Sequence, residues 1–338
     1  IAFTVWNSGG QTDVHADIVL RLTDEVGFVV ATTGTKRFYS SDGRDASSWL
    51  PRHDSTSDKP TLTSGLMVKG GETSPDGLMV LINDGNNISR SRNYCCLLPA
   101  GRRIGNTKRV ATLPSNWRRT VALYGARKLV TTNWVIDKDE YLRPDESKPG
   151  YEQWVDDCHV YALMDSVYNN CTAMRDVTYK GKSWRIKNHW FWRTRKDALK
   201  ALDTRETHAL YKDCKVEPVK AADGDDVFSI LTGDTQKPWE QTGDSYFAYV
   251  LPSLKLSPDA KKVLDILDGL WVKSLSIRES YAAGKPELHL TAYDAGVYQL
   301  KHLWRDLFPE DWKALQDAFH ALEGRLRDGV YEYGFLRR

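Results

Sequence analysis

The hydrophobic pattern of the chain changes at residue 257, and this change most restricts its fold. Ser257 and Pro258 have the residue types preferred at a helix N-cap and at the first helical position. After them, apolar residues recur at helical spacing through residues 260–271, and the same spacing returns in residues 297–307 and 312–326. The sequence therefore predicts a cluster of helices in the last part of the chain.

Upstream of residue 257 the apolar segments are short and bounded by turn residues, as is typical of strands. Residues 117–130 fit either a helix or a junction between a strand and a helix. Lys180 and Gly181 separate two alternating segments, which indicates a β-hairpin because glycine tolerates the positive φ of a tight turn. The segments expected to form strands are 27–33, 78–83, 94–100, 159–164 and 245–251.

Together these patterns predict an α+β fold, in which a β-rich mixed body precedes a C-terminal helical cluster. The chain has 338 residues, enough for one large or two ordinary domains. We divide it into a β-rich segment over residues 1–84, a basic β-rich region over residues 85–252 and a helical subdomain over residues 253–338. Because Ile1 opens directly into an apolar alternation, we expect the chain to be part of a longer protein.

Charge is strongly segregated along the sequence. Residues 85–136 contain ten lysines and arginines and no acidic residue. Residues 175–200 contain nine basic residues against two acidic ones, whereas the net charge of the whole chain is only +2. Such segregation is typical of a polyanion-binding surface. The alternative is that these cations are solvated, or form structural ion pairs with acidic residues in the rest of the chain. The segment that directly follows the first basic one, residues 137–165, is acidic.

Several common sites have no signature in the sequence. The glycine patterns of a P-loop or a dinucleotide-binding fold are absent, and no GxSxG or HExxH motif occurs. No apolar run reaches the roughly 18–20 residues that a membrane span needs, so we expect no membrane partner. The five cysteines form no CxxC pair, which is typical of reduced thiols in a cytoplasmic protein.

The basic segments favour binding to nucleic acid, because lysine and arginine neutralise phosphates while arginine and asparagine also read base edges. Tryptophans near the second segment could stack on an extruded base, or they could pack in the core. The residues predicted to contact DNA are Arg90, Arg92, Arg102, Arg103, Lys108, Arg109, Arg118, Arg119, Arg127, Lys128, Lys180, Lys182, Arg185, Lys187, Asn188, Trp190, Arg193 and Arg195.

A family resemblance gives this prediction a more definite form. The sequence YGARKLVTTNWVIDKDEYLRP at residues 124–144 resembles the C-terminal region of large bacterial adenine-specific DNA methyltransferases of type II restriction–modification systems, in which methylase and specificity region share one polypeptide. The other matching segments are residues 62–70, 157–164, 177–191, 293–296 and 330–336.

The resemblance implies that this chain is the target-recognition region of such an enzyme. In the family, the methyl-donor site and the Asn/Asp-Pro-Pro-Tyr/Phe motif that grips the flipped adenine lie upstream, and neither is present here. No catalytic residue and no metal ligand can therefore be assigned, and no cofactor is expected in this chain, although the parent enzyme would use S-adenosylmethionine. The expected partners are duplex DNA and the upstream catalytic domain, and the chain alone is expected to be inactive.

Two functions of other classes stay open. A metal-dependent nuclease needs two or three carboxylates and a lysine around a divalent cation. Residues 137–148 contain these types, including Asp137 and Asp139, although a solvated acidic turn has the same composition. A protein-interaction scaffold would instead dock a partner on the helices after residue 257, with its basic segments paired internally to acids.

Overall fold

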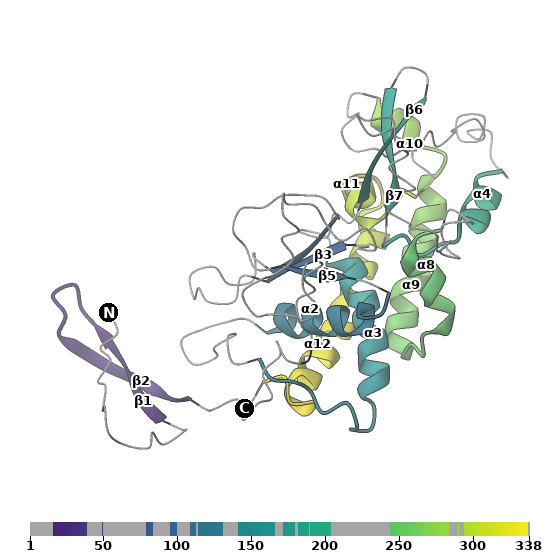
Figure 1. The fold of residues 1–338 in the computed structure, drawn as a ribbon. Helices are drawn as coiled ribbons and strands as arrows, with labels where there is room; N and C mark the ends of the chain where they lie inside the picture. Colours follow the sequence, from purple (N-terminus) through teal and green to yellow (C-terminus); the bar gives the residue numbers. More distant parts are fainter. Residues whose placement is uncertain are drawn as a thin grey trace, which may run out of the picture.

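The structure is a computed structural model that describes part of the chain. The described residues are 16–38, 49, 79–83, 95–99, 109–112, 114–130, 141–165, 172–179, 182–188, 190–203, 244–283, 290 and 294–336. This part is mostly helical (Figure 1), so the prediction of a β-rich mixed body is wrong. The division of the chain at residues 84 and 252 stays a prediction.

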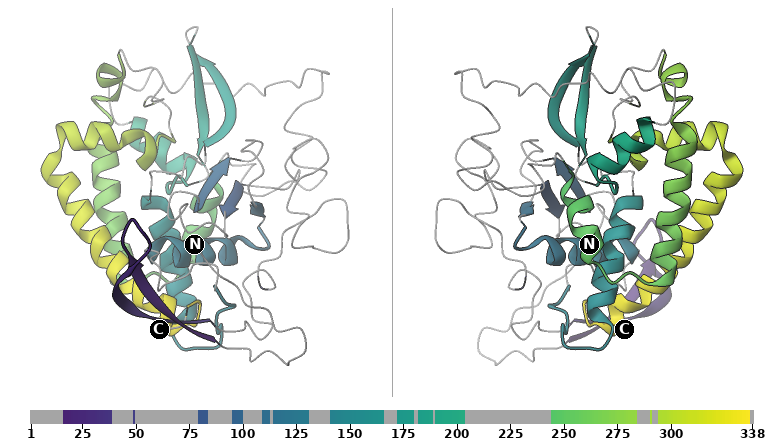
Figure 2. Two further views of the ribbon diagram at one scale, coloured as in Figure 1. Left: turned by 90° about the vertical axis from the view of Figure 1, so that its left-hand side faces the viewer. Right: turned by 90° about the vertical axis from the view of Figure 1, so that its right-hand side faces the viewer.

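The helices occupy the centre and one side of the described structure (Figure 2). In chain order they are α2 (Trp117–Leu129), α3 (Tyr151–Met164), α4 (Arg195–Asp203), α8 (Tyr246–Val250), the 3-10 helix η5 (Leu251–Ser253), α9 (Pro258–Ser274), α10 (Arg278–Ala282), α11 (Val297–Leu307) and α12 (Pro309–Glu332).

The described strands form small antiparallel sheets instead of one body. They are β1 (Ala16–Thr23), β2 (Val29–Phe38), β3 (Met79–Asn83), β4 (Cys95–Pro99), β5 (Arg109–Thr112), β6 (Thr172–Tyr179) and β7 (Lys182–Asn188). Strand β1 pairs with β2, β3 lies between β4 and β5, and β6 pairs with β7. The strands expected near residues 78–83 and 94–100 are confirmed. Strands β6 and β7 pair antiparallel, as the predicted hairpin requires, while its turn residues Lys180 and Gly181 lie outside the described residues.

The turn between β1 and β2 explains why β2 begins later than predicted. One carboxylate oxygen of Asp24 accepts hydrogen bonds from the backbone N–H groups of Val26 (3.0 Å) and Phe28 (2.8 Å). Gly27 has φ of 96°, a left-handed conformation that glycine adopts without a steric penalty. The residues up to Phe28 therefore belong to the turn, and β2 starts at Val29. The hairpin lies apart from the rest of the described chain (Figure 1).

Two segments predicted as strands are helical. Residues 159–164 form the second half of α3, which starts at Tyr151 and buries Trp154, Val155 and Cys158 along the same helix. Residues 245–251 form α8 and the start of η5, because the Ser245 hydroxyl accepts a hydrogen bond from the N–H of Ala248 and caps α8. A short apolar run has no periodicity of its own that would distinguish a strand from a buried helix.

The C-terminal helices form where the sequence predicts them. The Ser257 hydroxyl caps α9 by accepting a hydrogen bond from the N–H of Ala260 (3.3 Å). Helix α11 ends at Leu307, and α12 begins at Pro309, whose fixed φ suits the first helical turn. Helix α12 packs against α9 and also against α2 and α3, so the buried side chains of these helices belong to one hydrophobic core.

Because α3 and α12 pack closely, we predict that alanine has opposite effects on stability at two glycines of α12. At Gly329 a methyl group would meet the indole of the buried Trp154, whereas at the exposed Gly324 nothing lies within 4 Å. Overpacking costs about 1–3 kcal/mol, while alanine is the better helix former by about 1 kcal/mol. We expect Gly329→Ala to lower and Gly324→Ala to raise the midpoint of thermal unfolding. A rise in both would contradict the close contact.

Candidate nucleic-acid interface

The structure tests the geometry of only part of the predicted DNA-binding set. Arg109 lies on β5, and Lys182, Arg185 and Lys187 lie on β7, where the backbone is described. The predicted contacts that fall outside the described residues are Arg90, Arg92, Arg102, Arg103, Lys108 and Lys180. Their role in DNA binding stays a prediction.

The two arginines at the start of α2 form ion pairs within the fold. Arg118 bridges Asp156 and Glu152 of α3, with both N–O distances at 2.5 Å. Burial alone would lower the pKa of Arg118, but the hydrogen bond and charge of Asp156, together with Glu152, outweigh it and raise the pKa. Arg119 lies 3.5 Å from Glu146 and donates to the carbonyl of Trp49 (3.2 Å).

The two cations at the end of α2, Arg127 and Lys128, point inward, although both are predicted to contact DNA. The Lys128 ammonium is buried 3.6 Å from Asp165, and it also lies 5.8 Å from the ring centre of Tyr124. Arg127 is buried with its guanidinium 5.2 Å from the ring centre of Tyr141. Charge paired in this way holds α2 against its neighbours and is not presented to a polyanion.

The segment after β7 is also built into the core. Trp190 is buried, and its ring centre lies 4.9 Å from that of Trp117. The Asn188 side chain accepts a hydrogen bond from the N–H of Trp190 (3.0 Å), which shapes the turn. Arg193 pairs with Asp268 of α9 and lies 4.7 Å from the ring centre of Trp271. Of the two roles considered for Trp190, stacking on a base or packing in the core, the structure shows packing in the core.

Arg195 contributes to the start of α4 through its backbone. Its N–H donates to a carboxylate oxygen of Asp244 at 2.5 Å, which joins α4 to the segment that leads into α8. One residue further on, Lys196 is exposed, and so is Lys200 one turn later. Within the described residues neither lysine forms an ion pair. Both fall inside the basic segment 175–200, but the predicted contact set omitted them, although their spacing of four already places them on one helical face.

The ribbon formed by β6 and β7 projects from the body above α8 and α9 (Figures 1 and 2). Its register pairs Tyr179 with Lys182, Asp176 with Arg185 and Ala173 with Lys187. Three cationic residues thus follow one another along β7, and one of them has an acidic residue opposite. The ribbon leads directly, through the turn at residues 190–194, into α4 with its exposed lysines.

The structure offers no support for the nuclease alternative in the part of the chain that it describes. No group of three metal-ligating side chains occurs among these residues. Glu146 accepts a hydrogen bond from the indole of Trp49 (2.9 Å), and Asp145 accepts one from the Ser147 hydroxyl (2.6 Å). Asp137 and Asp139 lie outside the described residues. In the same described part, no helix is both long and apolar enough to cross a membrane.

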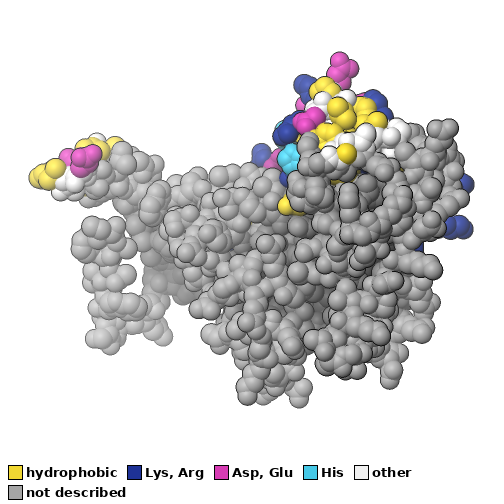
Figure 3. Space-filling view, turned by 90° about the horizontal axis from the view of Figure 1, so that it is seen from above, with side chains coloured by type: hydrophobic (Ala, Val, Ile, Leu, Met, Phe, Trp, Pro, Cys, Tyr) yellow, Lys and Arg dark blue, Asp and Glu magenta, His cyan; other side chains and the backbone are white. Residues whose placement is uncertain are grey.

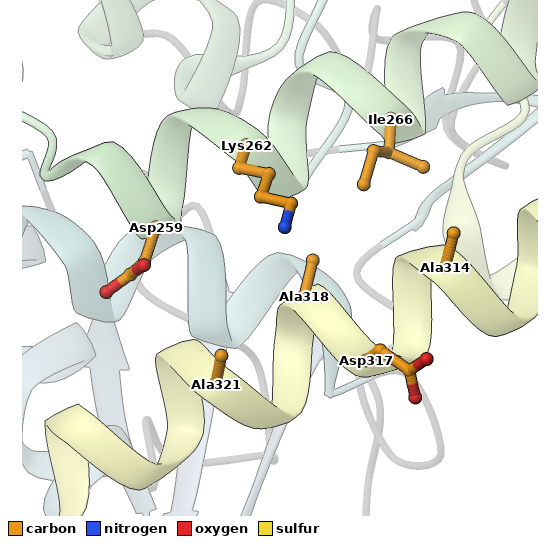
Figure 4. A pocket seen from close by; sticks show the side chains of 7 residues that line it. All are labelled: Asp259, Lys262, Ile266, Ala314, Asp317, Ala318 and Ala321. Carbon is orange, nitrogen blue, oxygen red and sulfur yellow. The ribbon is translucent and has the colours of Figure 1, made fainter.

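A pocket of about 290 Å³ lies between α9 and α12 (Figure 4). The side chain of Lys262 extends from α9 toward α12 across a floor of small residues. The carboxylates at its rim have partners, since Asp259 pairs with Arg325 and Asp317 pairs with Lys313. The remaining lining residues are Ile266, Ala314, Ala318 and Ala321. With two neutralised carboxylates and one lysine, the pocket has little net charge and does not extend the basic segments.

No known protein family, curated protein or solved structure matches this chain. The assignment to a methyltransferase family thus rests on the resemblance of the sequence segments alone.

Proposed function

We propose that the chain binds duplex DNA and acts as the target-recognition region of a bacterial adenine-specific DNA methyltransferase in the cytoplasm. The observation that carries the proposal is the projecting ribbon of β6 and β7, with three cationic residues on β7 and the exposed Lys196 and Lys200 of α4 beside it. The charge segregation of the sequence and the resemblance of residues 177–191 support the same assignment.

The dimensions of DNA fit this arrangement. The major groove is about 12 Å wide and admits a two-stranded ribbon, whose side chains then reach the base edges. Lysines on a neighbouring helix can hold the phosphates that border the groove, which fixes the register of the protein without reading sequence. We therefore assign base contact to the ribbon and phosphate contact to α4.

The paired cations of α2, and Arg193 in the turn before α4, have a different role in this proposal. Because Arg118, Lys128 and Arg193 are neutralised by carboxylates of the same chain, they give rigidity to the scaffold that carries the ribbon. Methyl transfer itself would belong to an upstream catalytic domain that binds S-adenosylmethionine and flips the adenine out of the duplex.

The proposal predicts a steep dependence of DNA affinity on salt. Each neutralised phosphate contributes about 0.9 to the slope of log affinity against log salt. We expect the double variant Lys196→Gln/Lys200→Gln to lower the slope by about 1–2, and Lys182→Gln/Lys187→Gln to weaken binding further. Arg118→Gln is the matched control, since its charge is used by Glu152 and Asp156, and it should leave the slope unchanged.

Fluorescence anisotropy of a labelled duplex, measured over a salt series, gives these slopes. A flat salt response of the unmodified chain, or no binding at low salt, would overturn the proposal. A loss of slope in Arg118→Gln equal to that of the α4 double variant would show that the ion pairs of α2 open on DNA, and it would reassign the contact surface to α2.

A protein-interaction scaffold is the second candidate, because the described cations of α2 are paired internally and a pocket of low net charge lies between α9 and α12. A partner held in that pocket would bind almost independently of salt. Among the described residues, however, Tyr298 and Leu307 are the large apolar side chains exposed on α9, α11 and α12, which is a small apolar surface for docking.

A further inference from the structure

Helix α11 presents a ring and two cations on one face, outside both basic segments of the sequence. Tyr298, Lys301 and Arg305 are three and four residues apart, so they line up along the helix surface. The opposite face is buried through Leu300 and Trp304. Tyr298 is 36% exposed, and the Lys301 ammonium lies 5.0 Å from the centre of its ring.

The two cations of this face repel each other. Burial lowers the pKa of Lys301, and the positive charge of Arg305 lowers it further. Lys301 forms no ion pair within the described part of the chain. Arg305 lies 3.2 Å from Asp306, but both side chains are largely exposed, so this pair contributes little. The Asp306 carboxylate also accepts a hydrogen bond from the Tyr281 hydroxyl (2.7 Å). An anion bound between the two cations would relieve their repulsion.

This face begins at the foot of the β6–β7 ribbon. The N–H of Asn188, the last residue of β7, donates to Asp294 at 2.7 Å. A methyl group on Gly296, the residue before α11, would come within 2.6 Å of the Asn188 side-chain amide. Figure 3 looks down on this end of the molecule, where Lys and Arg side chains lie among hydrophobic and acidic ones. A duplex held by the ribbon would therefore pass close to α11.

We propose that Tyr298, Lys301 and Arg305 form a phosphate-binding site that holds the DNA backbone beside the ribbon. One phosphodiester between the Lys301 ammonium and the Arg305 guanidinium would accept hydrogen bonds from both and offset their repulsion, and the Tyr298 hydroxyl can donate to a neighbouring phosphate oxygen. Contacts of this kind position the duplex and do not read its sequence. The inference rests on the proposed DNA binding for the identity of its ligand.

The first test measures the salt slope of duplex binding by variants of α11. Lys301→Gln and Arg305→Gln should each reduce the slope by about 0.9, the contribution of one phosphate contact. Lys313→Gln is the matched control, because Lys313 is an exposed lysine of the adjacent helix α12 and pairs with Asp317. Its slope should equal that of the unmodified chain. If the chain binds DNA steeply and the slopes of both α11 variants are unchanged, the inference is wrong and the proposed function stands.

The second test separates this inference from the proposed function. Inorganic tripolyphosphate is titrated into chain labelled with isotopic lysine, and the pKa of Lys301 is followed by NMR, with Lys301→Gln identifying its resonance. A bound polyphosphate should raise this pKa, because the anion favours the charged ammonium. If the chain fails to bind duplex DNA, the proposed function fails, and this measurement alone decides the inference: a rise retains the phosphate site, and an unchanged pKa removes it.

Discussion

Replacement of Asp157 by asparagine is expected to lower the free energy of unfolding by about 3 kcal/mol. The Asp157 carboxylate is fully buried on α3, and one oxygen accepts a hydrogen bond from the N–H of Ser257 at 3.0 Å. The other oxygen pairs with Arg325 of α12, which also donates to the Ser257 hydroxyl (2.7 Å). One carboxylate thus joins α3, the N-cap of α9 and α12. An amide of the same shape would present N–H donors to the guanidinium and remove its buried partner, which leaves Arg325 only its pair with the more exposed Asp259 among the described residues.

The matched control is Asp317→Asn on the exposed face of α12. Asp317 pairs with Lys313 four residues earlier, and both side chains are mostly exposed. Such pairs contribute about 0.3–0.5 kcal/mol, so this variant should unfold almost as the unmodified chain does. Urea titrations of the three proteins compare the free energies directly. If Asp157→Asn and Asp317→Asn had equal effects, the buried carboxylate would not be what joins the three helices.

The sequence predicts the C-terminal helices because their signals are local. Ser257, Pro258 and the break at Pro309 act within one turn, and a spacing of three and four residues identifies the buried face. The same reasoning fails for residues 159–164, where six apolar or aromatic positions give no period of their own. The helix there is set by the longer run from Tyr151 and by the contacts of Trp154 with Tyr333 and Phe335. Those partners are far away in the sequence.

The charge pattern is visible in the sequence, but its use is decided by tertiary contacts. Arg118 meets Asp156 across 38 residues, and Arg193 meets Asp268 across 75. One signal could have indicated the first pair, because the acidic segment 137–165 follows the acid-free segment 85–136 directly. Segments of opposite charge that follow one another in sequence can pack against each other, as α2 and α3 do. Net charge over a window cannot separate paired from unpaired cations.

The basic face of α11 has the opposite problem: its cations lie on the outer face of the helix, but no charge pattern in the sequence marks them. Residues 297–307 contain two bases, a histidine and one acid, so no charge window marks them. Only the helical period, together with the burial of Leu300 and Trp304, gathers Tyr298, Lys301 and Arg305 on one surface. Charge and periodicity therefore have to be combined. Where the apolar spacing predicts a helix, the same spacing also predicts which cations share its outer face.

Acidification below pH 6.5 is expected to destabilise the fold through His159. The ring is fully buried in α3, and its Nδ1 lies 2.8 Å from the carbonyl oxygen of Val155, so Nδ1 carries the hydrogen. Around it lie the rings of Trp117 and Phe247, at 6.2 and 6.5 Å between centres. Burial lowers the pKa of His159 from 6.5 to about 4, more than the hydrogen bond to Val155 raises it.

The sign of the effect follows from which state binds the proton first. In the unfolded chain His159 is protonated below pH 6.5, whereas in the folded protein it stays neutral until about pH 4. Stability is therefore unaffected by this group above pH 6.5 and falls as the pH drops from 6.5 to 4. A difference of two to three pKa units corresponds to about 3 kcal/mol, and no further loss is expected below pH 4.

The measurement compares the free energy of unfolding of the unmodified chain and His159→Gln over this pH range. Carboxylates elsewhere affect both proteins alike, so the difference between the two curves isolates His159. The glutamine amide can donate to the Val155 carbonyl, and it does not titrate, so the variant should lose about 3 kcal/mol less than the unmodified chain between pH 7 and pH 4. His320→Gln, a change at an exposed histidine of α12, should follow the unmodified curve. Parallel curves for His159→Gln and the unmodified chain would mean that the imidazole reaches solvent in the folded state, which would place an opening of the core between α2, α3 and α8.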